Sequence, residues 1–233
     1  MRRLAAALAR PGLDLLRGQA RCLARPRDLA VLFLGLLLGW WIYVPLHELL
    51  HAAACLAAGG EVWRLEISPL YGGALLASAI PWVVAGGDYA GRLAGFSTGG
   101  SDLVYLATDL GPFLLTLFPG VWALRRAARS GRALLFGLAI PFALAPFLSL
   151  PGDAYEIGSL AVTQLPAWSG EAAESALRGD DVARVARGLT ESEVPGRWTA
   201  FALAVVLALA WAWTTWGLGA LVARQLGEGP VRL

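Results

Sequence analysis

The sequence predicts an all-α polytopic membrane protein with about four transmembrane helices. Of its 233 residues, 57% are hydrophobic and only 15% are charged, whereas soluble domains average about 25% charged residues. The mean hydropathy is +0.59. A spanning helix needs about 20 mostly apolar residues. The stretches that meet this requirement are residues 29–57, 103–124, 133–150 and 199–223.

The first 28 residues form a basic segment, MRRLAAALARPGLDLLRGQARCLARPRD. A cleaved signal peptide would carry a short apolar core directly after its charges. Here the apolar run begins only near Leu29 and is too long. Leu and Ala recur at near-helical spacing within the segment, so we expect an amphipathic helix on the cytoplasmic membrane surface.

The segments between the spans predict shorter elements. "LLASAIPWVVAGG" (75–87) is too short to cross a bilayer, so we expect a re-entrant, hairpin-like or interfacial piece, or a buried lid. The glycine-rich stretch 86–100 is expected to be a flexible gate or a loop. In the acidic extramembrane region 161–198, residues 171–189 predict one exposed amphipathic helix.

The distribution of arginine predicts the orientation. Seven Arg precede the first span and four fill the short loop 125–132. The positive-inside rule then places both termini in the cytoplasm and both long connections outside. All 19 basic residues are Arg, which indicates a GC-rich bacterial genome and therefore a bacterial cytoplasmic membrane. No basic stripe interleaved with aromatics is present, which excludes nucleic acid as an expected partner.

The stretch HELLH (47–51) places ionisable groups inside the first apolar run. Such groups at membrane depth are candidates for function. His47 and His51 are the only histidines in the chain, and on a helix they share one face one turn apart. This spacing suits two nitrogen ligands of one Zn²⁺ ion. Glu48 projects to the side of them, where a general base of H-E-x-x-H metalloproteases lies.

A catalytic zinc site keeps a third protein ligand and one open position. Cys55 shares the face of the histidines, and three ligands in line along one helix cannot surround a tetrahedral ion. Asp153 is preferred because it follows Pro151-Gly152, where a broken helix can turn a carboxylate inward. Glu156 is an alternative ligand, or an acceptor for a histidine N–H. Asp109, inside a span, is expected to pair with Arg, support a ligand or line a substrate path.

These motifs resemble the site-2 protease family of intramembrane zinc metalloproteases. "HELLHAAACLAAGGEVWRLEISPLYGG" (47–73) is similar to the active-site helix of the family and the apolar hairpin that follows it. "LGPFLLTL" (110–117) is similar to its Gly-Pro element. "LPGDAYEIG" (150–158) stands in the place of its third-ligand motif, although here Gly precedes Asp153 and the chain has no Asn. The match covers roughly residues 35–160.

The resemblance implies a three-helix catalytic core within residues 29–160, followed by the acidic loop 161–198 and a C-terminal helix and tail, 199–233. His47, His51 and Asp153 would hold Zn²⁺, and Glu48 would activate water. The implied substrate is a transmembrane segment of another protein in the lipid bilayer. Two alternatives stay open: a zinc membrane protease of another class with Glu156 as third ligand, and a non-catalytic relative that binds membrane proteins.

The predicted hydrolysis needs a polar path to the metal, because water must reach a site inside the membrane. The polar residues at the end of the glycine-rich stretch and directly after it, and Asp109 of the second span, are candidates to line this path. They are Ser97, Thr98, Ser101 and Asp109.

Overall fold

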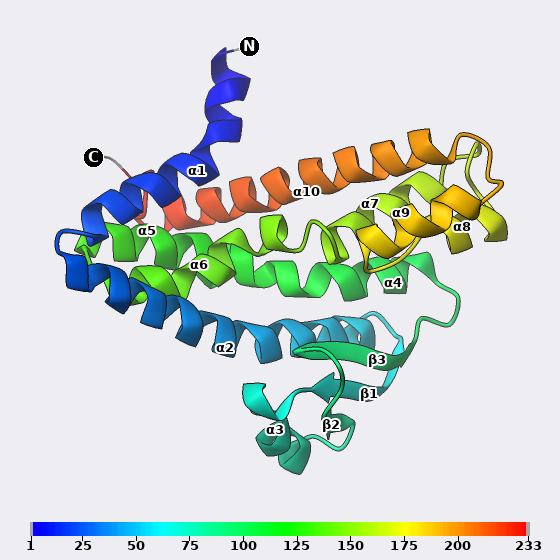
Figure 1. The fold of residues 1–233 in the computed structure, drawn as a ribbon, viewed down its shortest axis with the longest axis horizontal. Helices are drawn as coiled ribbons and strands as arrows, with labels where there is room; N and C mark the ends of the chain where they lie inside the picture. The colour runs from blue at the N-terminus through cyan, green and yellow to red at the C-terminus, as the bar shows by residue number, and fades with distance from the viewer. Residues whose placement is uncertain (1, 232–233) are drawn as a thin grey trace.

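The structure is a computed structural model that describes residues 2–231 and is mostly helical (71%). Four helical segments are long and apolar enough to cross a membrane, which confirms the four predicted spans. They are Pro26–Ala57, Asp102–Ser130, Ala133–Thr163 and Arg197–Gln225. These segments run along the long axis of the molecule, and a small sheet lies against one flank (Figure 1).

The first span is the continuous helix α2 (Pro26–Ala57). It begins at a proline, whose missing N–H leaves no bond unmade in a first turn. Asp28 accepts a hydrogen bond from the Arg25 N–H at 2.8 Å. The helix ends before Gly59, which adopts a φ of 93°. At 1.5 Å per residue α2 is about 48 Å long, and it therefore exceeds a hydrocarbon core of about 30 Å.

Helix α2 packs closely against α6 (Ala133–Leu148), the first part of the third span. A Cβ on Gly35 would overlap the carbonyl of Leu134, and a Cβ on Gly137 would overlap the carbonyl of Leu32. Small residues let membrane helices approach until their backbones touch, and this contact supplies the attraction that lipid does not. The glycine seam therefore fixes the distance between the first and third spans.

The second span is interrupted in its middle. It runs through α4 (Asp102–Leu110), the short turns η2 (Gly111–Phe113) and η3 (Thr116–Gly120), and α5 (Val121–Ser130). Phe118 has extended dihedrals, φ −158° and ψ 131°. The Thr116 hydroxyl donates to the Phe142 carbonyl at 2.8 Å. Irregular backbone is tolerated at membrane depth where it is buried in protein in this way.

The third span breaks where the sequence predicts. Helix α6 ends at Leu148, residues 149–152 form a turn, and α7 (Asp153–Thr163) continues the span. Helix α7 then packs against α10 (Arg197–Gln225). At their contact a Cβ on Gly158 would overlap the Ala204 carbonyl. This contact places the start of α7 inside the bundle.

The connection after α2 forms a three-stranded sheet, which corrects the expectation of an all-α chain. Strands β1 (Glu61–Ile67), β2 (Val83–Ala85) and β3 (Gly91–Ser97) lie in the order β2-β1-β3. β1 pairs in parallel with β2, with Leu65 opposite Val83, and antiparallel with β3, with Leu65 opposite Leu93. Leu65, Ile67 and Val83 are buried on its inner side.

The sheet also replaces two looser expectations for residues 75–100. The short segment 75–87 contributes the end of helix α3 (Gly73–Ala79) and all of β2, and turn η1 (Pro69–Tyr71) precedes it. The middle of the stretch expected to be a gate or loop, residues 86–100, is strand β3. The β-branched and aromatic residues of these segments can pack as strands because β1 satisfies their backbone groups.

The single helix expected over 171–189 is wrong, because two helices form there. Helix α8 (Glu171–Leu177) ends at Arg178, and α9 (Val182–Glu191) begins after Asp181, whose side chain accepts a hydrogen bond from the Arg184 N–H at 3.0 Å. An Asp at this position competes with helix continuation by capping a new one. Leu177 and Leu189 face inward and pack with residues of α7 and α10.

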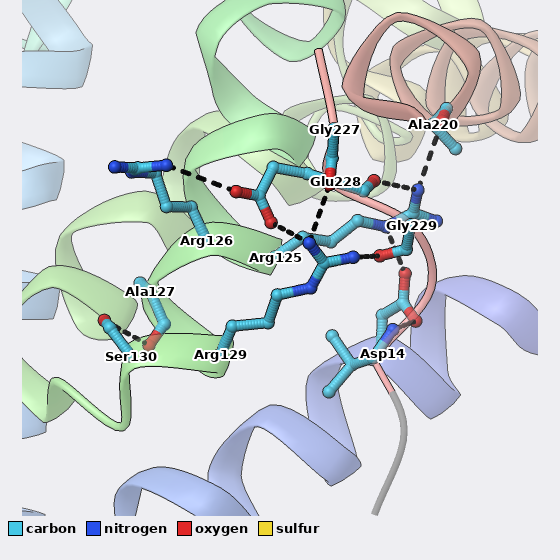
Figure 2. Close-up of polar contacts among 11 residues, drawn as sticks. Asp14, Arg125, Arg126, Ala127, Arg129, Ser130, Ala220, Gly227, Glu228 and Gly229 are labelled. Atoms are coloured by element: carbon cyan, nitrogen blue, oxygen red, sulfur yellow. Dashed lines mark hydrogen bonds and ion pairs between the residues drawn. The ribbon is translucent and has the colours of Figure 1, made fainter. Parts of the chain in front are cut away.

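The basic N-terminal segment forms helix α1 (Arg2–Cys22), which confirms the helix expected there. It packs at the end of the bundle where α5 ends and the C-terminal tail follows α10 (Figure 1). Figure 2 shows the polar cluster that joins these elements. Arg125 of α5 is 1% exposed and its Nε donates to Asp14 Oδ2 at 2.8 Å.

The same cluster fixes the C-terminal tail. Arg125 also donates to the carbonyls of Ala220 and Glu228, at 3.1 and 3.4 Å. Its guanidinium carbon lies 5.3 Å from the centre of the Trp216 ring. Asp14 Oδ1 accepts from the Val231 N–H at 3.1 Å (Figure 2). One buried ion pair therefore connects the first helix, the second span and the tail.

We expect Arg125→Met to lower the free energy of unfolding by about 3–5 kcal/mol, because it leaves the Asp14 carboxylate buried without its partner. Arg187→Met is the control, since Arg187 is exposed and no ion pair of the described residues involves it, so its loss should change stability by less than about 0.5 kcal/mol. Thermal unfolding in detergent micelles measures both. Equal losses in the two variants would contradict a structural role for the buried pair.

Candidate metal centre

Helix α2 brings the two histidines together. His47 and His51 lie one turn apart, and their ring centroids are 4.7 Å apart at an interplanar angle of 81°. Their Nε2 atoms are 3.1 Å from each other. His51 is buried and His47 is half-buried. Two ring nitrogens therefore converge on one point beside the helix, as the i, i+4 spacing predicts.

Asp153 faces this point from the third span. Its Oδ2 lies 3.2 Å from His47 Nε2, and its Oδ1 lies 3.7 Å from His51 Nε2. Asp153 is the first residue of α7, so the break in the third span sets its direction. The turn is held by the N–H groups of Gly152 and Ala154, which both donate to the Ser149 carbonyl. The break therefore turns a carboxylate toward α2.

The other ring nitrogens are held by hydrogen bonds. His51 Nδ1 lies 2.8 Å from the Thr108 carbonyl oxygen. A carbonyl can only accept, so Nδ1 donates, and Nε2 of the neutral ring keeps the lone pair that a metal requires. His47 Nδ1 lies 2.7 Å from the Tyr43 hydroxyl. Such contacts orient histidine ligands in metal sites.

The Gly-Pro element of the second span explains why the Thr108 carbonyl can serve His51. In a regular helix this carbonyl would accept from residue 112, but Pro112 has no N–H. The carbonyl keeps capacity for a second donor beside the Gly111 N–H. A Cβ on Gly111 would overlap the Leu50 carbonyl. Gly111 therefore permits the close approach to α2, and Pro112 frees the acceptor.

The distances in this group suit a tetrahedral metal ion. Two ligands at 2.0–2.1 Å from a tetrahedral Zn²⁺ ion lie about 3.3–3.4 Å apart. The contacts here are of similar length: 3.1 Å between the two Nε2 atoms, 3.2 Å from His47 Nε2 to Asp153 Oδ2, and 3.7 Å from His51 Nε2 to Asp153 Oδ1. His47, His51 and Asp153 could therefore hold a metal ion. Two neutral imidazoles and a carboxylate are a ligand set of catalytic zinc sites.

Glu48 lies beside the three candidate ligands, under the start of strand β3. A Cβ on Gly91 would overlap the Glu48 side chain, so the strand covers the carboxylate with backbone alone. Glu48 lines two cavities, one that includes His51 and one that includes His47. It therefore sits where a base can serve a water molecule that enters from either cavity.

The cavities differ in their walls. The Asp109 cavity, about 450 Å³, includes His51, Tyr105, Asp109, Glu156 and Asp180. The Trp40 cavity, about 320 Å³, includes Trp40, Tyr43, Val44, Leu148 and Pro151. Glu48, Asp153 and Asp180 line both. The candidate metal site, formed by His47, His51 and Asp153, therefore borders an acidic cavity and a mainly apolar one.

The other candidates from the sequence take different places. Asp109 and Glu156 line the Asp109 cavity, and Glu156 accepts a hydrogen bond from the Tyr105 hydroxyl. Cys55 is buried and its thiol donates to the Glu61 carbonyl at 3.8 Å.

Three of the polar residues expected along a water path do not line either cavity: Ser97, Thr98 and Ser101. Ser101 instead caps α4, where its hydroxyl accepts from the Val104 N–H at 3.4 Å.

The structure adds residues that the sequence did not single out. Tyr43 precedes His47 by four residues, so its helical spacing could have indicated it. Tyr105, Thr108 and Asp180 come from other elements, and no local pattern marks them.

We expect purified protein to hold about one zinc ion per chain, and Asp153→Ala to lose most of it, since two histidines alone bind zinc weakly. Glu156→Ala, three residues further along α7, is the matched control and should keep the metal. Elemental analysis of the purified proteins measures both. The reverse result would make Glu156 the ligand and favour the other class of zinc protease.

Comparison with known proteins gives no match for this chain: no protein-family model matches it, and neither a search of curated proteins nor one of solved structures finds a similar protein. The resemblance to the site-2 protease family rests on the three quoted motifs alone.

Proposed function

We propose that this chain is an intramembrane zinc metalloprotease that hydrolyses peptide bonds in or near transmembrane segments of membrane proteins. The observation that carries the proposal is the convergence of His47, His51 and Asp153 beside the Glu48 carboxylate, within segments apolar enough to span a membrane. Buried ionisable groups of this kind are retained in membranes for function. The motifs of the site-2 protease family point to the same activity.

Each residue of the site has a separate role in the proposed hydrolysis. Bound Zn²⁺ supplies Lewis-acid chemistry, which polarises the scissile carbonyl and makes water a better nucleophile. Glu48 takes a proton from the attacking water on its carboxylate and delivers it to the leaving amine. The Nδ1 atom of His51 keeps its proton and donates it in a hydrogen bond to the Thr108 carbonyl throughout, so the tautomer of the ring does not change. Tyr43 orients His47 in the same way.

Two features of the chain suit an extended peptide as the substrate. The two cavities that border the candidate metal site give room for residues before and after the scissile bond. Strand β3 pairs with β1 on one side only, and its residues 91–93 line the Asp109 cavity. An edge strand can receive an extended segment through main-chain hydrogen bonds. A substrate helix would have to unwind locally to bind there.

The two alternative functions make different demands on the same residues. A zinc protease with a Glu third ligand would need Glu156 near the histidine nitrogens, but its carboxylate is engaged by Tyr105. A non-catalytic binding protein would have no use for Glu48. The geometry therefore favours Asp153 as ligand and an active Glu48.

We expect Glu48→Gln to reduce cleavage at least about 100-fold, because the amide cannot take up the proton, while zinc content stays near that of the parent protein. The assay follows fragments of transmembrane peptides by mass spectrometry, using purified protein in detergent. Comparison of membrane proteomes from cells with parent protein and Glu48→Gln identifies substrates, which should accumulate uncut in the variant.

Glu171→Gln removes the same charge from an exposed position on α8 and serves as the control. Unchanged cleavage in Glu48→Gln, or a purified protein without zinc, would refute the protease proposal and leave the binding protein as the better account.

A further inference from the structure

The Asp109 cavity holds more carboxyl groups than the proposed hydrolysis uses. Its walls include five carboxylates, those of Glu48, Asp109, Asp153, Glu156 and Asp180. Asp153 would be neutralised by the metal, and Glu48 is the proposed base. Three carboxylates remain, and Arg92 is the single basic residue among those that line this cavity.

Of the three remaining carboxylates, Asp109 has the greatest need of a partner. The residue is 4% exposed, and its Oδ2 is buried without any hydrogen-bond partner in the described structure. An ionised carboxylate buried without a partner is strongly unfavourable. Because it lines a cavity of about 450 Å³, the missing partner can be a group that enters with the substrate.

The neighbouring carboxylates are held toward the same space. Tyr105 donates to Glu156 Oε1 and so orients that side chain. Asp180 belongs to the turn between α8 and α9, which Arg178 fixes through two hydrogen bonds to Asp102, at 2.8 and 3.1 Å. The turn is anchored again where the Val182 N–H donates to the Pro151 carbonyl at 3.0 Å. The Glu156 side chain is therefore held in place, and the turn that carries the exposed Asp180 is anchored on both sides of that residue.

Arg92 does not complete the site from within. Its guanidinium carbon lies 5.5 Å from the centre of the Tyr89 ring, and no ion pair of the described residues joins it to a carboxylate of the cavity. The Trp40 cavity, which includes His47, shares Glu48, Asp153 and Asp180 with the Asp109 cavity, and the rest of its walls are mainly apolar. The two cavities therefore differ in the chemical groups that they can bind.

We propose that the Asp109 cavity binds a cationic group of the peptide substrate, an ammonium or guanidinium, with Asp109 as its main partner. The inference rests on the proposed protease function and specifies its substrate class: a peptide with a positive charge on one side of the scissile bond and apolar residues on the other. Lys and Arg occur at the ends of transmembrane segments, so such a charge lies near the region to be cut. Charge-assisted hydrogen bonds to buried carboxylates give this selectivity.

The test uses a series of transmembrane peptides in which one Lys is moved along a neutral sequence, each paired with a Gln peptide. Every peptide is made with a free and with an acetylated N-terminus, which separates a side chain from the terminal amine as the bound cation. Binding is measured by fluorescence anisotropy on zinc-loaded Glu48→Gln protein, which does not depend on cleavage. Cleavage rates are measured on protein with Glu48 intact.

We expect the best Lys peptide, or the free-amine peptides, to bind at least about tenfold more tightly than the neutral partner. Asp109→Asn in the same background should remove most of this preference, and Glu156→Gln should weaken it. Glu171→Gln, which removes a charge outside the cavity, should leave it unchanged. The zinc content of each variant is measured alongside, so that loss of the metal group is recognised.

Equal binding of charged and neutral peptides, or a preference that survives both cavity variants, would overturn the inference while cleavage by the parent protein could still stand. A second zinc ion per chain that is lost in Asp109→Asn would also overturn it, because the cavity would then hold a metal. Conversely, a charge preference in binding without any cleavage would uphold the cation site and refute only the protease.

Discussion

The contact between Asp153 and the two imidazoles of α2 is the constraint on which the rest of the bundle depends. It joins polar groups from two spans inside an apolar bundle, at separations of 3.2 and 3.7 Å. An ionised carboxylate at such a place is costly unless it is paired or coordinates a metal. The third span must therefore break at 149–152, so that a helix can begin at Asp153. The glycine seam between α2 and α6 brings that break within reach.

The second span also contributes to this site, because it supplies the acceptor that His51 requires. His51 needs an acceptor for its Nδ1 proton inside the bundle, and helical carbonyls are normally occupied. Pro112 releases the Thr108 carbonyl, and Gly111 allows its segment to lie against the backbone of α2. A helix interruption that would cost stability in isolation thus becomes part of the site. The motif has a physical role that does not depend on any likeness to other proteins.

Local patterns in the sequence predicted the elements that local forces determine. The four spans follow from apolar length, the break from Pro151-Gly152, and the histidine pair from its spacing. The sheet was missed because its strands are short and are held by pairing between residues up to 36 positions apart (97 − 61). The split of 171–189 was missed because Asp181 is exposed and helix-compatible until it caps α9. Asp180, Tyr105 and Thr108 join the site only through tertiary packing.

The two ends of the bundle offer water different access to the metal group. His47 stands 21 residues from the start of α2 (47 − 26) and 10 from its end (57 − 47), or about 32 and 15 Å along the helix. The far end carries the buried Arg125–Asp14 pair and the Trp216 side chain. The near end carries β3 and the α8–α9 turn, whose residues line the cavities. Water should therefore reach the candidate metal site from the sheet end, which the arginine distribution predicts to face the outside.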